Sequence, residues 1–339
     1  MITTTIKNLH LRDVWTISRN SSCVKENVFV RLEKDGVVGY GEAAPNIRYG
    51  ETAALTEAAI QKAAEAIEGA ELSNTTQVKA RLDALIVGQN CAKAALEMAV
   101  MDWAAKSRAV PLHRMLGIDT THMPITSYSI GIDEPEVIKR KTKQAEEFLI
   151  LKIKVGSPND EAIIKAIRSV TDKPIRADAN EGWADKETAV RKIERLAAWG
   201  IEFVEQPMPA AMLAETAWVR QRVAIPLIAD EAVLSSADIA SLTEAYDGIN
   251  IKLMKAGGIQ EAVKMIQIAR TLGLKVMVGC MIESSLAVTA AAHLSPLVDW
   301  ADLDGNLLIS DDPFCGVTVA GGRLMLTDRP GIGITGGWQ

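Results

Sequence analysis

The sequence has little cysteine, no long apolar run and no excess of basic residues. Its four cysteines (Cys23, Cys91, Cys280 and Cys315) form no CxxC pair, so neither a disulfide framework nor a cysteine-rich zinc site is expected, and a reducing compartment suits them. No apolar stretch reaches the ~18 residues of a membrane span. The net charge of −6 and the isoelectric point near 5.4 argue against nucleic acid and anionic membranes as partners.

The N-terminal residues 1–7 lack the apolar core of a secretory signal, which favours a cytoplasmic protein. What the chain does have is length and ordinary globular composition: 339 residues, of which 48% are apolar and 24% charged. That length suffices for one large domain with a smaller one. A homo-oligomer is compatible with the sequence.

The first ~115 residues predict an α+β unit. Residues 27–32 and 37–41 are strand-like and flank Asp35-Gly36, a hairpin signal. Residues 51–67 and 90–105 follow with apolar side chains at helical spacing.

After residue 124, short apolar runs alternate with helical segments. The predicted strands are 125–130, 149–155, 175–178, 201–205, 227–230, 249–253, 276–279 and 298–302, and helical segments such as 160–170, 186–198, 236–246 and 258–272 lie between them. This alternation predicts parallel strands with right-handed crossovers. Eight such units form a closed (β/α) barrel, in which functional groups lie at the C-terminal ends of the strands. The last ~25 residues, rich in glycine, predict a short β tail that returns to the N-terminal unit.

Charged residues end five successive strands of this predicted barrel. In chain order they are Lys154, Asp178, Glu205, Asp230 and Lys252, separated by 178−154=24, 205−178=27, 230−205=25 and 252−230=22 residues. A barrel unit has about 30 residues, so each gap is roughly one unit. One rim is therefore expected to carry the order Lys, Asp, Glu, Asp, Lys.

Each of these residues also has an ordinary interpretation. Asp178 or Asp230 alone could be a helix N-cap, Glu205 a rim acid and Lys252 a solvated strand end. Lys152 and Lys154 share one face of their strand, and both could be solvated at a sheet edge. The joint order favours chemistry, because three adjacent carboxylates repel one another unless a divalent cation lies among them, and oxygen ligands suit Mg²⁺.

Lysines on either side of such a cation suit proton abstraction next to a carboxylate. The resulting carbanion needs its charge on oxygen, as an enediolate stabilised by the cation. One neutral lysine can take the proton and the opposite lysine can return it. That arrangement is what racemisation or epimerisation requires.

The motifs resemble those of the enolase superfamily, muconate lactonizing enzyme subgroup, over nearly the whole chain. They are Lys152-Ile153-Lys154, Asp178-Ala179-Asn180, Glu205-Gln206-Pro207, Asp230-Glu231 and Asn250-Ile251-Lys252, together with Gly41-Glu42. The resemblance implies an α/β fold: a (β/α)7β-type modified TIM barrel (119–314), an α+β N-terminal capping domain (1–118) and a C-terminal tail (315–339) that completes it.

The resemblance also implies roles for individual residues. Asp178, Glu205 and Asp230 would bind one Mg²⁺, with Asn180 and Glu231 in support. Lys154 and Lys252 would be the acid/base pair, and Lys152 would aid the substrate carboxylate. Lys255 is expected to lie outside the chemistry.

The eighth strand ends in Asp302 and Asp304, which would share a face at the rim. They could be turn acids before Gly305, and a second metal is less attractive because no further ligand cluster is evident. The functional interpretation is a clamp for a substrate ammonium. This DxD resembles that of the dipeptide epimerases, where it holds the free amino terminus of the dipeptide.

Two loop arginines complete the predicted site. Exposed loop arginines are usually ordinary surface residues. The segments around Arg19 and Arg48, with Gly279-Cys280-Met281, nevertheless resemble the L-Ala-D/L-Glu epimerases of murein-peptide recycling. The resemblance implies that Arg19 pairs with the glutamate side chain of the substrate, and the same role is open to Arg48.

Three other functions stay open at this point. The same mechanism could serve an N-succinylamino acid racemase or an o-succinylbenzoate synthase, whose substrates offer no ammonium to Asp302 and Asp304. A barrel lysine such as Lys252 could form a Schiff base, as in aldolases, although imine chemistry does not need three acids. A non-catalytic binding barrel fits least, because an idle charge cluster is costly to bury.

Overall fold

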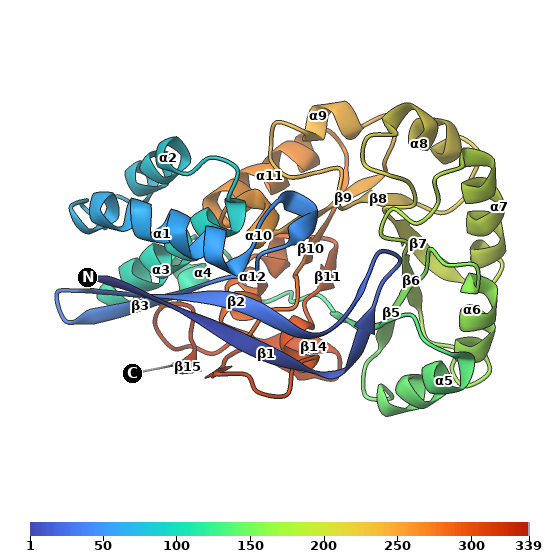
Figure 1. The fold of residues 1–339 in the computed structure, drawn as a ribbon, viewed down its shortest axis with the longest axis horizontal. Coiled ribbons are helices and arrows are strands. Elements are labelled where there is room, and N and C mark those ends of the chain that lie inside the picture. Colours follow the sequence, from blue (N-terminus) through green and yellow to red (C-terminus); the bar gives the residue numbers. More distant parts are fainter. Residues whose placement is uncertain (338–339) are drawn as a thin grey trace.

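The computed structural model describes residues 1–337, and a barrel of eight parallel strands dominates it (Figure 1). The strands follow one another around the barrel in sequence order: β4 (Ser127–Ile130), β5 (Ile150–Lys154), β6 (Ile175–Asp178), β7 (Ile201–Glu205), β8 (Leu227–Ala229), β9 (Gly248–Lys252), β10 (Lys275–Gly279) and β11 (Trp300–Asp302). A parallel bridge between Thr126 and Ala301 joins the first strand to the last. All eight predicted strands are confirmed, and no end shifts by more than two residues.

Helices cover the outside of the barrel, and α5 to α9 form the outer arc in Figure 1. They are α5 (Pro135–Gln144), α6 (Asp160–Arg168), α7 (Lys186–Ala197), α8 (Leu213–Arg220), α9 (Ile239–Leu242), α10 (Leu253–Ala256), α11 (Ile259–Thr271) and α12 (Ser285–Ala292). Strand β11 is followed by a short 3-10 turn, Gly305–Leu307, in place of an eighth helix. The (β/α)7β-type barrel is therefore confirmed.

One predicted helix is much shorter than expected. The periodicity predicted helix over 236–246, whereas α9 spans only Ile239–Leu242. The preceding residues form a loop, because Asp238 accepts a hydrogen bond from the Ser235 backbone N–H (2.8 Å) and Glu261 accepts one from that of Ser236 (2.8 Å). Side-chain acceptors thus replace the carbonyl partners that a longer helix would need.

The N-terminal unit is an antiparallel three-stranded sheet packed on helices. Its strands are β1 (Ile2–Thr16), β2 (Ser21–Lys34) and β3 (Val37–Ala43), and its helical segments are η1 (Ile47–Tyr49), α1 (Ala53–Glu68), α2 (Thr75–Leu85), α3 (Asn90–Ser107) and α4 (Leu112–Met115). Asp35 and Gly36 both have positive φ (52° and 75°), which suits the two-residue turn joining β2 to β3. The predicted hairpin and both predicted helices are confirmed.

Strand β3 lies almost directly on the backbone of α3. A Cβ atom at Gly41 would lie 1.9 Å from the carbonyl oxygen of Ala95, so only glycine fits there. The close approach buries the α3 face that carries Ala95 and Ala99. It also fixes Glu42, the next residue, against the barrel.

The C-terminal tail contacts the N-terminal unit. It contains β12 (Phe314–Cys315), β13 (Thr318–Ala320), β14 (Arg323–Met325) and β15 (Thr335–Gly336). Asp102 of α3 accepts a hydrogen bond from the Ile332 backbone N–H (2.8 Å), and Gly331 accepts one from that of Leu112 (2.8 Å). The division at residues 118 and 314 stays a prediction, and residues 338–339 of the predicted tail lie outside the described part. Within residues 1–337, no helix combines the length and apolarity needed to cross a membrane.

The loop between β1 and β2 reaches the C-terminal rim of the barrel. Ser18 Oγ donates a hydrogen bond to the carbonyl oxygen of Asn180 (2.8 Å), and the Ile132 backbone N–H donates to that of Thr16 (2.9 Å). The N-terminal unit therefore covers the rim at which the charged strand ends meet.

Candidate active site

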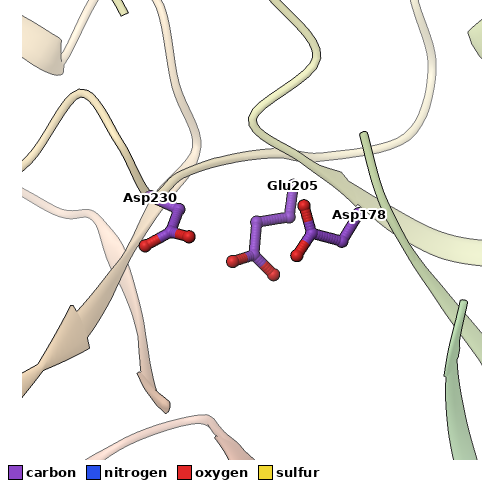
Figure 2. A group of neighbouring side chains, drawn as sticks. All are labelled: Asp178, Glu205 and Asp230. Carbon is purple, nitrogen blue, oxygen red and sulfur yellow. The ribbon is translucent and has the colours of Figure 1, made fainter. Parts of the chain in front are cut away.

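Three carboxylates converge at the rim of the barrel. Asp178 and Glu205 end β6 and β7, and the register pairs one with the other, while Asp230 directly follows β8. Each offers one oxygen atom, and these atoms lie within 4.8 Å of one another; all three residues are at most 1% exposed. Figure 2 shows the three side chains, with Glu205 between the two aspartates.

This acid set suits a hard divalent cation. Burial, reinforced by Asp178, raises the pKa of Glu205 to about 7, because ionised carboxylates packed together without water oppose one another. Three oxygen donors at one point are the ligands that Mg²⁺ prefers. The residues present therefore fit the predicted metal site.

Two lysines contact the outer members of the acid cluster from different strands. Lys154 Nζ lies 2.6 Å from Asp178 Oδ2, and Lys252 Nζ lies 2.8 Å from Asp230 Oδ2. Burial opposes the charged form of Lys252, but Asp230 outweighs this effect and raises the pKa of Lys252 above its ordinary value. One amine thus comes from β5 and contacts Asp178, whereas the other comes from β9 and contacts Asp230.

Lys152 lies deeper in the barrel than the other two lysines, with 1% of its surface exposed. Its Nζ is 2.6 Å from Asp302 Oδ2, 2.7 Å from Glu205 Oε2 and 3.1 Å from Asp178 Oδ2. Burial disfavours its charge, yet these three acids together raise the pKa of Lys152 well above its ordinary value. The alternative of a solvated edge lysine is wrong, and Lys152 supplies a fixed positive charge in the site.

Asp302 and Asp304 form the predicted acid pair. Ser127 Oγ donates to Asp302 Oδ1 (2.7 Å), and the Ser129 backbone N–H donates to Asp304 Oδ2 (2.6 Å). Burial and the nearby charge of Asp302 raise the pKa of Asp304 to about 7. Both acids line the same cavity of about 310 Å³ as Lys154 and Lys252. The acid pair and the two lysines therefore face one cavity.

Asn180 and Glu231 lie beside the cluster. The Asn180 backbone N–H donates to Asp178 Oδ1 (3.0 Å), and Asn180 Nδ2 donates to Glu231 Oε1 (3.3 Å). Asn180 and Glu181 have left-handed backbones, with φ of 43° and 67°, which non-glycine residues seldom adopt. Such strain persists where the surroundings fix the backbone, and it is common at functional loops.

The two predicted arginines are held by acids of the barrel. Arg19 lies 2.8 Å from Glu231 Oε1 and 2.9 Å from Glu181 Oε2, and it lines the cavity. Arg48 makes a two-point contact with Glu181, with both distances 2.8 Å, and is not among the residues that line the cavity. Arg19 thus lines the cavity, whereas Arg48 lies outside the lining and contacts Glu181, which also contacts Arg19.

Comparison with known proteins identifies the lineage of this fold and site. Residues 137–337 match the enolase C-terminal domain-like family, and residues 1–117 match the mandelate racemase/muconate lactonizing enzyme N-terminal domain. The chain belongs to the enolase superfamily.

Similar superfamily members carry names that describe their activities. The L-Ala-D/L-Glu epimerase of Bacteroides thetaiotaomicron is 44% identical over 330 residues, which cover 96% of this chain and 85% of that protein. A dipeptide epimerase from Cytophaga hutchinsonii, solved with Mg and D-Ala-L-Val, is 30% identical with a TM-score of 0.94 and covers 99% of this chain and 95% of its own. An N-succinyl Arg/Lys racemase from Bacillus cereus is 28% identical with the same TM-score and the same coverage, 99% and 95%. The fold alone therefore does not separate the two candidate activities.

Three residues lie at this superfamily site although the sequence analysis assigned them no role in it: Asn250 was named only within a motif, Lys255 was expected outside the chemistry, and Lys25 was not named. Asn250 Nδ2 donates to Glu205 Oε1 (2.8 Å); its place two residues before Lys252 on β9 was a usable signal, since such residues share a face. Lys255, on α10, is buried and lies 2.6 Å from Asp230 Oδ1 without lining the cavity. Lys25 of β2 does line the cavity, and no motif pointed to it.

Proposed function

We propose that this protein is a Mg²⁺-dependent dipeptide epimerase, an isomerase that inverts the α-carbon of the C-terminal residue of a dipeptide. The proposed substrate is L-Ala-D/L-Glu, a dipeptide of murein-peptide recycling in the cytoplasm, because the relative that is 44% identical is named for it. One observation carries the proposal: two lysines flank a three-acid cluster in a cavity that also holds the Asp302–Asp304 pair.

Asp178, Glu205 and Asp230 would hold the cation, with Asn180 and Glu231 fixing the neighbouring backbone and side chains. Bound Mg²⁺ would supply the positive charge that stabilises negative charge developing on the substrate carboxylate.

The chain's own residues perform the proton transfer. Lys152 would attract the substrate carboxylate, and Asp302 with Asp304 would hold the ammonium, which together fix the α-carbon between the two amines. Lys154 would remove the α-proton from one epimer while Lys252 delivers a proton to the opposite face, with the roles exchanged for the other epimer. Residues 1–118 would act as the cap that excludes water and selects the side chain.

A second candidate is an N-succinylamino acid racemase of the same superfamily, because such a racemase shares this fold. The buried Asp302–Asp304 pair disfavours it. Lys152 already offsets the charge of Asp302, and an acylated nitrogen has no charge to offer Asp304, whereas a dipeptide ammonium does.

A dipeptide library incubated in D₂O with Mg²⁺ and read by mass spectrometry tests the proposal. We expect deuterium at the α-carbon of the C-terminal residue, strongest for L-Ala-L-Glu and L-Ala-D-Glu, and loss of exchange when EDTA is added. Exchange with no dipeptide, or undiminished exchange of N-succinylamino acids by a D302N/D304N variant, would contradict it.

A further inference from the structure

Five cationic side chains line the cavity, and four of them already have acidic partners. The nearest distances are 2.6 Å for Lys152 to Asp302, 2.6 Å for Lys154 to Asp178, 2.8 Å for Lys252 to Asp230 and 2.8 Å for Arg19 to Glu231. Lys25 is the fifth cation, and within residues 1–337 its side chain has no hydrogen bond or ion pair. A partly buried ammonium is stabilised when it pairs with an opposite charge, so an anionic group of a ligand could bind to Lys25 in this cavity.

The backbone around Lys25 is held firmly. In the β1–β2 ladder Lys25 lies opposite Leu9. Asn27, two residues later and therefore on the same face, donates hydrogen bonds to Glu42 Oε1 (2.8 Å) and to the carbonyl oxygen of Ile282 (3.1 Å). Lys25 thus projects from a fixed strand toward the barrel mouth, on the side of the cavity formed by the N-terminal unit. The residue is partly buried, and this burial lowers the pKa of its amine.

Arg19 has its charge balanced already. It contacts Glu231 and Glu181, and it also donates to the carbonyl oxygen of Asn180 (2.9 Å). A substrate carboxylate that took Arg19 would have to displace these acids or share the guanidinium with them. Glu181 also contacts Arg48, so the two acids balance the two arginines and the pair gives the cavity no net positive charge.

We propose that Lys25 recognises the side-chain carboxylate of the C-terminal residue of the dipeptide. This inference rests on the proposed epimerase function and deepens it by naming the residue that selects an acidic side chain. In the proposed function, the cation held by the three acids would receive the substrate's own carboxylate together with Lys152, and Asp302 with Asp304 would receive its ammonium. The remaining unpaired cation of the cavity then matches the remaining charge of L-Ala-D/L-Glu.

The test compares an acidic substrate with its neutral isostere. We would measure kcat/KM for L-Ala-L-Glu and L-Ala-L-Gln in the presence of Mg²⁺ and take the ratio of the two values. Charge-assisted hydrogen bonds of this kind correspond to about 10- to 100-fold, so Lys25→Gln should lower the Glu/Gln ratio by about that factor. Lys25→Arg keeps a positive charge and should restore most of the ratio.

Two further variants serve as references. Lys62 is an exposed lysine of α1 that does not line the cavity, so Lys62→Gln should leave the ratio as in the wild type. Arg19→Gln should lower kcat/KM for both dipeptides together, because Arg19 holds Glu231 and the Asn180 carbonyl.

Three results would overturn the inference: equal loss on both dipeptides in Lys25→Gln, an Arg19→Gln variant that alone removes the preference for glutamate, or a wild-type enzyme that does not prefer L-Ala-L-Glu to L-Ala-L-Gln. A wild-type protein that epimerises neither dipeptide nor any other contradicts the proposed function instead. The two failures are therefore distinguishable.

Discussion

At the scale of single residues, Lys154 and Lys252 differ in what holds them. Lys154 contacts Asp178 and lies 5.8 Å from the centroid of the Trp15 ring, whereas Lys252 contacts Asp230, which Lys255 also contacts. The two lysines belong to different strands and contact different acids, so neither amine can reach the position of the other unless the backbone moves. A two-base mechanism makes a sharp prediction from this asymmetry.

Replacing either lysine by methionine should abolish epimerisation but should leave exchange of the α-proton with solvent for one of the two epimers. General base catalysis contributes 10²–10⁴-fold, so Lys154→Met and Lys252→Met should each lower epimerisation by about 10³-fold or more. The lysine that stays can still remove the α-proton of the one epimer it faces. Proton NMR in D₂O should therefore show each variant exchanging a different epimer of Ala-Glu. Exchange of the same epimer by both variants would refute the two-sided arrangement.

The Asp302–Asp304 pair makes its own prediction. Asp302 forms an ion pair with Lys152 and accepts a hydrogen bond from Ser127. Asp302→Asn should therefore weaken the attraction for the substrate ammonium and also remove one of the ion pairs of Lys152. A charged hydrogen bond lost from a buried site corresponds to about 10- to 100-fold in kcat/KM. The measurement is steady-state epimerisation of L-Ala-L-Glu, with N-acetyl-L-Ala-L-Glu as the matched substrate. The wild type should reject the acetylated peptide, and the variant should discriminate far less.

At the scale of elements, two barrel helices begin on acids of the N-terminal unit. Glu97 of α3 accepts hydrogen bonds from the Ile259 backbone N–H (2.6 Å) and the Gln260 backbone N–H (3.0 Å) at the start of α11. Glu42 accepts them from Ser284 (2.9 Å) and Ala287 (3.3 Å) at the start of α12. Both acids are buried, and each satisfies helix donors that would otherwise lack partners. The N-terminal unit is thus tied to the barrel through helix caps.

These caps give folding stability a defined pH dependence. Burial raises the pKa of Glu97 from 4.5 to about 7, so between those values the folded protein holds a proton that the unfolded chain has released. The contribution of Glu97 to stability is present below pH 4.5 and is lost as the pH rises to about 7. Urea midpoints measured from pH 5 to 8 should therefore fall less steeply for Glu97→Gln than for the wild type.

The exposed Glu65 of α1 offers the matched control, and Glu65→Gln should keep the wild-type slope. Parallel slopes for Glu97→Gln and the wild type would show that the helix cap does not carry the pH dependence.

The elements also show where sequence reasoning succeeds and fails. The barrel strands are predictable because their apolar runs end in charged residues, as at Asp178 and Glu205. Helix α2 (Thr75–Leu85) escaped notice because only two of its apolar residues, Val78 and Leu82, are buried and most of the others are polar. Helix α9 was overextended because periodicity does not reveal the side chains that bind the Ser235 and Ser236 backbone.

At the scale of the whole molecule, the metal-ligand candidates follow from the order of strand ends, but their partners do not. The contact of Arg48 with Glu181 joins residues 133 apart in sequence, and nothing local signals it. The same holds for Lys25, whose importance depends on which cations of the cavity are already neutralised. Charge balance is a property of the assembled cavity, so it becomes visible only once the N-terminal unit lies over the barrel.

Metal binding should stabilise the whole assembled molecule. The cluster brings three buried carboxylates together, and a cation that binds only the folded protein adds about 2.7 kcal/mol at 100 times its Kd. Thermal unfolding should therefore shift upward by several degrees with saturating Mg²⁺ and return on addition of EDTA. Glu205→Gln should remove most of that shift, because the central ligand is lost, while Glu194→Gln on the exposed face of α7 should keep it. An equal Mg²⁺ shift in both variants would place the bound ion elsewhere than at these strand ends.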